Sequence, residues 1–268
     1  MSDLIKEYAG GMPCKGHAED GDSLLWAGLL HASGMRLDES IVASQTDDGQ
    51  FFRSPLRAEN ARHGLVELNS FSRDMSTGLN LAAAADSAPF KVIDAYEAWI
   101  DYIRKNGCRA CKDTDGRCIM TPANFWMASY AGADNIPVGY ELTRWLNKPY
   151  LLVASTFNPK GFQLHLVGVS IFAMVFHYGS RKKLPISLRL ACAMLKRRQP
   201  KNAFFAWLAG DNEHAKKIND AIKAHLAVNG QGDRRHQWCW ERDDAEEAWR
   251  DSCGWDVEFI DNLLKLSI

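Results

Sequence analysis

Apolar residues recur every three or four positions along most of the chain, which is the spacing of one face of an α-helix. The clearest stripe lies in residues 90–105 and contains Val92, Ile93, Tyr96, Trp99, Ile100 and Ile103. Short strands at regular intervals are missing from the pattern, and so is an alternation of strands with helices. The sequence therefore predicts an all-α fold. Residues 1–268 are expected to form a single helical domain with long irregular loops, and residues 1–21 an irregular arm.

Polar caps, glycines and prolines set the limits of the predicted helices. Asp22 or Ser23 caps a helix that Gly34 ends, and Pro185 opens another. Residues 38–68 have few periodic signals and predict a long functional loop, with space for one short helix. Residues 150–157 fit either a strand or a helix. The predicted helices cover residues 24–33, 72–85, 90–105, 123–131, 139–146, 162–178, 186–198, 203–208, 212–227 and 243–266, the last broken near Gly254.

The most apolar run of the chain is Leu164–Phe176. It is too short to span a bilayer, and it contains His165 and Ser170. Because the run leaves little polar face, other helices must surround it. We therefore expect it to form a buried helix at the centre of the fold.

Composition is that of an ordinary globular protein, with 46% apolar and 24% charged residues. The net charge of -1 gives no overall attraction to nucleic acid or to an anionic membrane. The N-terminus lacks the apolar region of a secretory signal, so we expect synthesis in the cytoplasm. Export by a non-classical route stays open, and no localisation is predicted. The nine tryptophans fit a well-packed helical core or a platform for sugar rings.

The seven cysteines include a cluster formed by Cys108, Cys111 and Cys118. Three thiols are one ligand short of a zinc site, and no histidine lies nearby, so neither a metal nor another cofactor is predicted. The short loop between Cys111 and Cys118 contains Asp115-Gly116, which can turn, and we predict that the two cysteines can form a disulfide. The sequence signatures of zinc peptidases, papain-like proteases, α/β-hydrolases, P-loop proteins, dinucleotide-binding proteins and kinases are missing.

Acids and an arginine stand at the starts of two predicted helices. Asp22 begins the first, and Arg73-Asp74 follows Ser72 at the second. Each acid can serve its own helix, Asp22 as the N-cap and Asp74 in the first turn, where the helix dipole favours negative charge. If the two helices pack with their N-termini together, the acids instead share one cleft. Two carboxylates in one cleft can take different pKa values and act as acid and base.

Other residues are candidates for holding a substrate at such a cleft. Arg53 precedes Ser54-Pro55, and with Arg73 it supplies cationic groups. Trp238 and Trp240 stand next to Glu241-Arg242, where they can form a sugar-binding wall or pack the final helix across the body. The candidate catalytic residues are thus Asp22 and Asp74, and the candidate substrate-binding residues are Arg53, Arg73, Trp26, Trp238 and Trp240.

Three segments carry a resemblance to a known class of enzymes. The helix start Gly21–Trp26, the loop Phe52–Pro55 and the segment Phe71–Met75 resemble, over residues 20–85, carbohydrate-active enzymes of the α/α-toroid type. In those enzymes, acids at helix ends and loops with tryptophan and arginine line a sugar cleft. The resemblance implies acid/base roles for Asp22 and Asp74. The chain is short for a complete toroid, so it implies an incomplete α/α toroid.

Two functions follow as hypotheses. The first is a hydrolase or lyase that cleaves a polysaccharide, such as a cell-envelope glycan, by carboxylate acid/base chemistry. The alternative is a non-enzymatic component of a phage or secretion system, whose acids only cap helices. The expected partners are the polysaccharide and, by analogy with effectors carried by phage tails or contractile secretion machines, a delivery machinery. Neither nucleic acid nor insertion into a membrane is expected.

Overall fold

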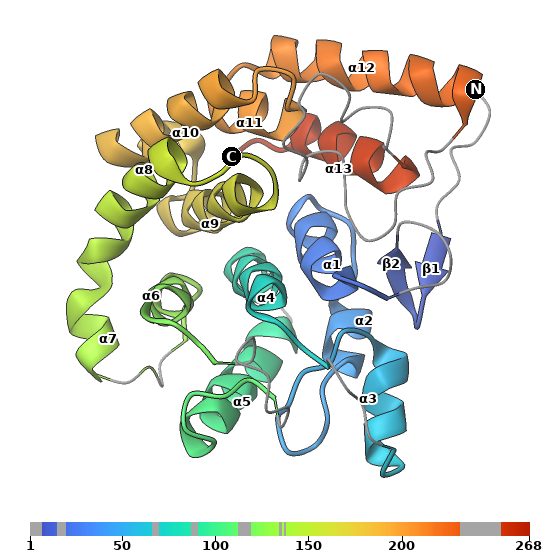
Figure 1. The fold of residues 1–268 in the computed structure, drawn as a ribbon, viewed down its shortest axis with the longest axis vertical. Coiled ribbons are helices and arrows are strands. Elements are labelled where there is room, and N and C mark those ends of the chain that lie inside the picture. The colour runs from blue at the N-terminus through green and yellow to red at the C-terminus, as the bar shows by residue number, and fades with distance from the viewer. Residues whose placement is uncertain are drawn as a thin grey trace.

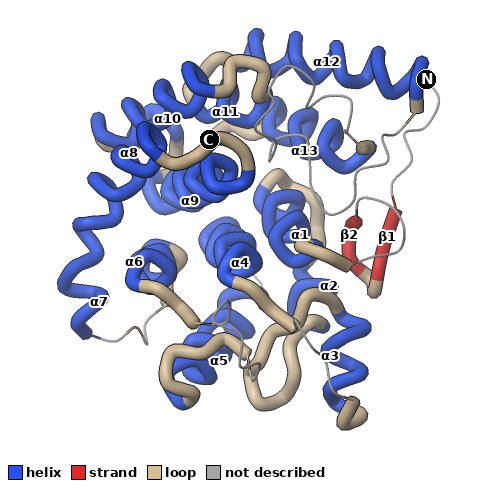
Figure 2. The backbone as a smooth tube through the Cα atoms, viewed as in Figure 1, coloured by secondary structure: helices blue, strands red, loops and turns tan. Residues whose placement is uncertain are grey.

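The computed structural model describes residues 7–14, 20–65, 70–86, 91–111, 119–133, 136, 138–230 and 253–268 of the chain. Its elements are almost all helices, and the all-α fold predicted from the sequence is confirmed (Figures 1 and 2). The helices are α1 (Ser23–Ala32), α2 (Asp38–Ala43), α3 (Pro55–Arg62), α4 (Arg73–Ala85), α5 (Lys91–Lys105), α6 (Pro122–Tyr130), α7 (Val138–Thr143), η2 (Arg144–Leu146), α8 (Asn147–Phe157), α9 (Phe162–Tyr178), η3 (Arg181–Lys183), α10 (Ile186–Arg198), α11 (Ala203–Leu208), α12 (Asn212–Asn229) and α13 (Gly254–Lys265). Two short strands, β1 (Glu7–Ala9) and β2 (Met12–Cys14), complete the described elements.

Helix α9 is the central helix of the fold. It contacts α4, α6, α8, α10 and α11, and nearly all of its residues from Leu164 to Val175 are buried. Burial also lowers the pKa of His165 to about 3, so this histidine stays neutral inside the core. The expectation that the apolar run forms a buried central helix is confirmed. Among the described helices, none combines the length and the apolar character needed to cross a bilayer.

Helices α1 and α4 pack against each other through two glycines. A Cβ atom on Gly28 would lie 2.2 Å from the backbone oxygen of Gly78, and one on Gly78 would lie 2.5 Å from the Cα of Leu25. The two backbones can approach so closely only because neither position carries a side chain. Each glycine is the sixth residue of its helix, so the contact is equally far from the two helix starts at Ser23 and Arg73.

The N-terminal arm contains a β-hairpin that the sequence pattern did not predict. Glu7 pairs with Cys14 and Ala9 with Met12 in antiparallel register. Gly10 and Gly11 form the turn, with φ of 58° and 87°. A two-residue hairpin turn needs this pair of positive φ angles, so the Gly-Gly dipeptide was a usable signal. Each strand has only three residues, which is too short for an alternating pattern to be recognised.

The predicted loop over residues 38–68 was the largest error, because it contains both α2 and α3. These helices have six and eight residues, and each buries only one side chain, Ile41 or Ala58. Such short and polar helices show little periodicity. Residues 150–157, for which strand and helix were both open, belong to α8. Of the predicted final helix, residues 243–252 lie outside the described residues, and the described part is α13.

Cys111 is disulfide-bonded. Cys118, its predicted partner, lies outside the described residues, so the pairing of these two cysteines stays a prediction.

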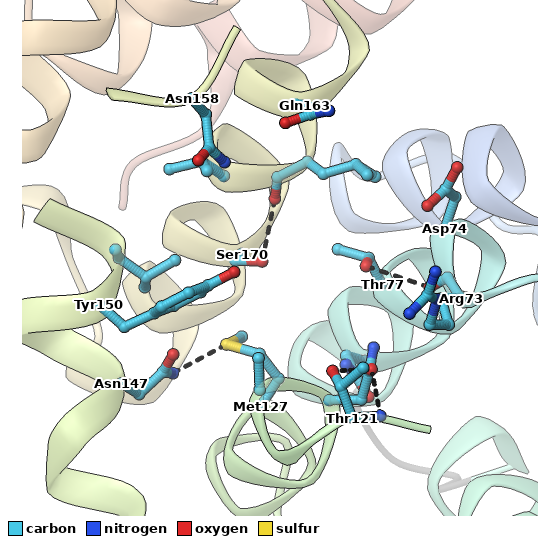
Figure 3. Close-up of a pocket in the computed structure, with 16 residues that line it drawn as sticks. Arg73, Asp74, Thr77, Thr121, Met127, Asn147, Tyr150, Asn158, Gln163 and Ser170 are labelled. Atoms are coloured by element: carbon cyan, nitrogen blue, oxygen red, sulfur yellow. Dashed lines mark hydrogen bonds between the residues drawn. The ribbon is translucent and has the colours of Figure 1, made fainter. Parts of the chain in front are cut away.

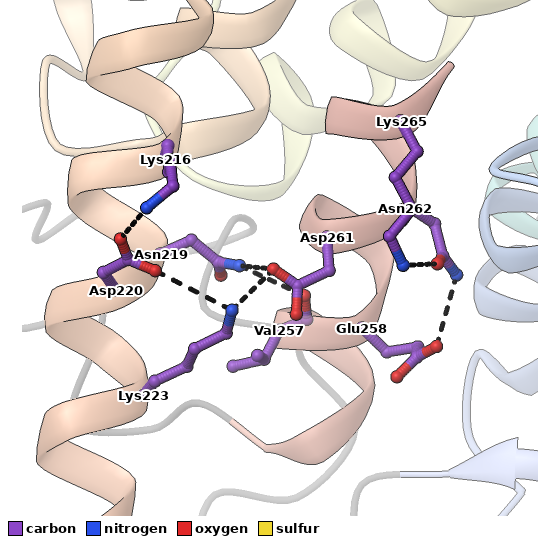
Figure 4. A network of polar contacts seen from close by, with 9 residues as sticks. All are labelled: Lys216, Asn219, Asp220, Lys223, Val257, Glu258, Asp261, Asn262 and Lys265. Carbon is purple, nitrogen blue, oxygen red and sulfur yellow. Dashed lines mark hydrogen bonds and ion pairs between the residues drawn. The ribbon is translucent and has the colours of Figure 1, made fainter.

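A polar network joins the long helix α12 to α13 (Figure 4). Asn219 is fully buried, and its Nδ2 donates to the backbone oxygen of Val257 at 3.2 Å and to Oδ1 of Asp261 at 3.0 Å. Lys223 Nζ lies 2.6 Å from the same Asp261 oxygen. The network gives the buried Asn219 amide two acceptors on α13 and so holds α13 on α12.

We expect Asn219→Leu to lower the free energy of unfolding by about 1–3 kcal/mol, because two acceptors lose a buried donor. Chemical denaturation measures the change. The matched control is Lys216→Ala, which removes an exposed pair with Asp220 on the same helix and should leave the midpoint unchanged. Equal midpoints for Asn219→Leu and the unmodified chain would show that the network does not stabilise the fold.

Candidate functional site

The loop before α1 is tied to the start of α3 by one acid. Asp20 accepts from Ser54 Oγ at 2.8 Å and from two nitrogens of Arg57, Nε at 2.5 Å and Nη2 at 3.0 Å. Ser54 is the N-cap residue of α3, and Pro55 is the first residue of that helix. This contact brings Arg53, the residue before Ser54, against the start of α1.

Arg53 holds the start of α1 in place. Its Nη1 donates to the backbone oxygen of Gly21 and to Asp22 Oδ1, the latter at 3.3 Å. The Arg53 side chain is only 8% exposed, against 31% for Asp22. Although burial lowers the pKa of Arg53, a guanidinium remains charged. Arg53 is therefore placed to orient the Asp22 carboxylate, while the carboxylate keeps part of its surface open.

The N-cap residues of α1 and α4 are of types that often cap helices, but their side chains do not do so here. Asp22 precedes α1 and Ser72 precedes α4, yet neither side chain accepts a capping hydrogen bond from its helix. Ser72 Oγ is buried, without a hydrogen-bond partner among the described residues. The interpretation of Asp22 as an ordinary helix cap, which the sequence left open, thus lacks the bond that defines it.

Asp74, in the first turn of α4, has a raised pKa. Burial is the largest cause, and the negative charge of Asp22 adds to it, while Arg73 and Arg53 act in the opposite direction. The shift runs against the helix dipole, which favours the charged form in a first turn. Because the Asp22 charge acts on Asp74, the two carboxylates lie at the same end of the α1–α4 pair.

The raised pKa of Asp74 predicts how stability depends on pH. A carboxyl group whose pKa is higher in the folded than in the unfolded chain binds its proton more tightly when folded. Its contribution is fully favourable below the unfolded pKa, about 4, and is lost as the pH rises through the folded pKa. Asp74→Asn cannot ionise, so we expect it to raise the melting temperature at pH 7, with a gain that shrinks as the pH falls towards 4.

Thermal unfolding across this pH range tests the prediction. The control is Asp94→Asn, an exposed acid in the first turn of α5, which should change the melting temperature little at any of these pH values. A lower melting temperature for Asp74→Asn at pH 7 would contradict the assigned direction of the shift.

A cavity of about 280 Å³ opens beside the first turn of α4 (Figure 3). Residues from α4, α6, α8 and α9 line it. Figure 3 shows Arg73 and Asp74 on one wall and Asn147 and Tyr150 of α8 on the opposite wall. Nine of the sixteen lining residues are polar but uncharged, and five of these carry side-chain amides: Asn80, Asn124, Asn147, Asn158 and Gln163.

The structure groups four of the predicted site residues around Asp74 and buries a fifth, Trp26, in the core. Arg73 and Asp74 line the cavity, while Asp22 and Arg53 are outside the lining but close enough for their charges to act on Asp74. Trp26 is fully buried in the core and offers no surface to a substrate in this structure. The remaining two candidates, Trp238 and Trp240, lie outside the described residues.

Sequence reasoning missed the wall opposite Asp74. Asn147, Tyr150 and Gln163 reach the cavity from α8 and α9, far from the Arg73-Asp74 segment along the chain. One signal was available within α4 itself. Asn80 stands between Leu79 and Leu81 and is 1% exposed, and an asparagine within an apolar helical run points to a polar role inside the fold.

The arrangement can perform acid–base chemistry on a bound polar molecule. One carboxylate, Asp22, is paired with an arginine, and the other, Asp74, is biased towards its protonated form. Among the described residues no group of three His, Cys, Asp or Glu side chains is placed to hold a metal ion.

Comparison with models of protein families, with curated proteins and with solved structures finds no match in any of the three. No activity can therefore be carried over from a relative, and the chemistry of the Asp22–Asp74 pair and its cavity is the basis for a function.

Proposed function

We propose that the protein cleaves glycosidic bonds of a polysaccharide, such as a cell-envelope glycan, with Asp74 as the proton donor and Asp22 as the second carboxylate. The single observation that carries the proposal is the unequal environment of two neighbouring acids. Asp74 is half-buried and has a raised pKa, whereas Asp22 forms an ion pair with Arg53. Enzymes that cleave glycosidic bonds use such a pair, one carboxyl group protonated and the other ionised.

The roles of the residues follow from these environments. Asp74 gives its proton to the oxygen of the departing sugar, and the ionised Asp22 serves the opposite half of the reaction as base or nucleophile. Arg53 orients Asp22 through their ion pair and does not itself contact the substrate. Arg73 is exposed at the edge of the cavity, where its charge is available to a polar group of the glycan.

The non-enzymatic alternative explains part of the same site. It requires the acids to serve only their helices, and the position of Asp74 in the first turn of α4 agrees with that role. It accounts less well for Asp22, which makes no capping bond, and for a carboxyl group whose pKa is raised.

Release of reducing ends from a panel of cell-envelope glycans tests the proposal. We expect the intact chain to release reducing ends from at least one glycan, and Asp74→Asn to lose this activity while remaining folded. Absence of release from every glycan in the panel would favour the non-enzymatic alternative.

A further inference from the structure

The cavity beside Asp74 has an uncharged interior. Among the described residues that line it, Arg73 and Asp74 are the only charged ones, and they stand next to each other in the first turn of α4. The rest of the polar lining consists of amides and of hydroxyls, which come from Thr77, Thr121, Tyr150 and Ser170. Burying a charged group of a ligand there is unfavourable, because a charge needs an opposite charge or a full set of hydrogen bonds.

Two amide atoms in this lining lack hydrogen-bond partners. Asn80 and Asn147 are each 1% exposed. Asn80 Oδ1 accepts from the Tyr96 hydroxyl and Asn147 Nδ2 donates to Met127 Sδ at 3.0 Å, but Asn80 Nδ2 and Asn147 Oδ1 have no partner among the described residues. A buried polar atom without a partner costs about 1–3 kcal/mol, so hydrogen bonds from a polar ligand to the Asn80 and Asn147 side chains would offset a cost already present at the cavity wall.

The cavity also offers apolar surface and an aromatic ring. Leu151, Leu166 and Val167 contribute side chains to the lining, and Tyr150 is 46% exposed on the wall opposite Asp74 (Figure 3). The ring of Tyr150 is steadied by Trp126, whose centroid lies 6.3 Å away in an edge-to-face arrangement. Uncharged sugar rings present just this mixture to a protein, with hydroxyl groups around the edge and an apolar face that packs on an aromatic ring.

We propose that this cavity is the binding subsite for an uncharged sugar ring of the glycan. The inference rests on the proposed function for its place in the reaction, but the binding itself does not depend on cleavage. If cleavage occurs beside such a ring, it is hydrolysis. The bond between the anomeric carbon and the glycosidic oxygen breaks, and the oxygen of water bonds to that carbon and keeps one hydrogen. The departing sugar gains a proton on its oxygen from the acid, and the second proton of the water restores the acid–base pair. For a glycan made only of uncharged rings, elimination is unavailable, because it removes a proton made acidic by the carboxylate of a uronic acid.

Binding to Asp74→Asn, which is expected not to consume its ligand, tests the subsite directly. The probes are tetrasaccharides of glucose, of N-acetylglucosamine and of galacturonate, titrated calorimetrically. We expect at least one of the two uncharged probes to bind about tenfold or more tightly than galacturonate, since each hydrogen bond left unmade in a buried site costs about that factor. Preference for galacturonate, equal binding of all three, or binding of none would overturn the inference.

Variants connect the binding to this cavity. Tyr150→Ala, in the Asp74→Asn chain, should weaken binding of the preferred uncharged probe about tenfold or more by removing the stacking surface. The matched control is Trp145→Ala, an aromatic residue that is 63% exposed in the preceding η2 turn and does not line the cavity. Loss of binding in the control but not in Tyr150→Ala would place the ligand elsewhere and contradict the inference.

The outcomes separate the two proposals. An uncharged probe that binds through Tyr150 but is never cleaved by the intact chain supports the subsite and contradicts the proposed function. Cleavage of a uronate polymer with appearance of an unsaturated sugar, detected by ultraviolet absorbance, supports glycan cleavage and contradicts the uncharged subsite.

Discussion

Asp74→Asn is expected to lower the turnover of a cleaved glycan by about 10²–10⁴-fold, which is the usual contribution of a general acid or base. The substitution keeps the size and shape of the side chain but removes the acidic proton whose binding the raised pKa favours. Because the loss concerns a group that acts in the transition state, kcat should fall while KM changes little. Initial rates of reducing-end release over a range of glycan concentrations measure both constants.

Two further variants make this expectation specific. Asp22→Asn should also lower kcat, and it should lower the apparent pKa of Asp74 seen in the pH–rate profile, because the Asp22 charge is one cause of the raised value. Asp94→Asn, an exposed first-turn acid on α5, should leave kcat unchanged. Full activity of Asp74→Asn would remove Asp74 from the reaction.

Gly28→Ala is expected to destabilise the fold by about 3 kcal/mol or more. Its new methyl group would lie 2.2 Å from the backbone oxygen of Gly78, and a backbone cannot move aside as a flexible side chain can. Alanine favours helix formation over glycine by only about 1 kcal/mol, which does not offset the clash. Because domains are stable by about 5–15 kcal/mol in total, the loss should be visible as a large drop in melting temperature.

The control for this substitution is Gly139→Ala in α7. A Cβ atom there would meet none of the described residues within 4 Å, so only the helix propensity changes, and stability should stay the same or rise. A melting temperature of Gly28→Ala equal to that of Gly139→Ala would mean that α1 and α4 can separate without cost.

The sequence predicted those parts of the fold that depend on long-range periodicity. The apolar run of α9 and the stripe of α5 each extend over several turns, and their burial follows from the pattern alone. Helix α3 buries only Ala58, and its position instead depends on the bonds that Asp20 makes with Ser54 and Arg57. No pattern within α3 records those bonds, because the acid lies outside the helix.

The two acids of the candidate site could be predicted from the sequence, but the residues that form the cavity walls could not. Asp22 and Asp74 stand at helix starts, where local sequence is informative. The upward shift of the Asp74 pKa depends on burial and on the charge of Asp22, which precedes another helix. Neither cause can be read from the residues next to Asp74 in the sequence. The amide of Asn147 faces the cavity only because α8 packs beside α9 and α6.

The close contact between Gly28 and Gly78 is the point about which any change in the angle between α1 and α4 would turn the helix starts that carry Asp22 and Asp74. Each glycine is five positions after the first residue of its helix, a distance of about 7.5 Å along the helix axis. A change of about 10° in the angle between α1 and α4 would therefore move one helix start relative to the other by about 1.3 Å. Carboxylates about 5–5.5 Å apart retain the configuration of the sugar, and those about 6.5–9.5 Å apart invert it. A tilt of this size is comparable to the gap between the two ranges, so if the pair cleaves a glycan as proposed, the residues that fix the helix crossing would also govern its stereochemistry.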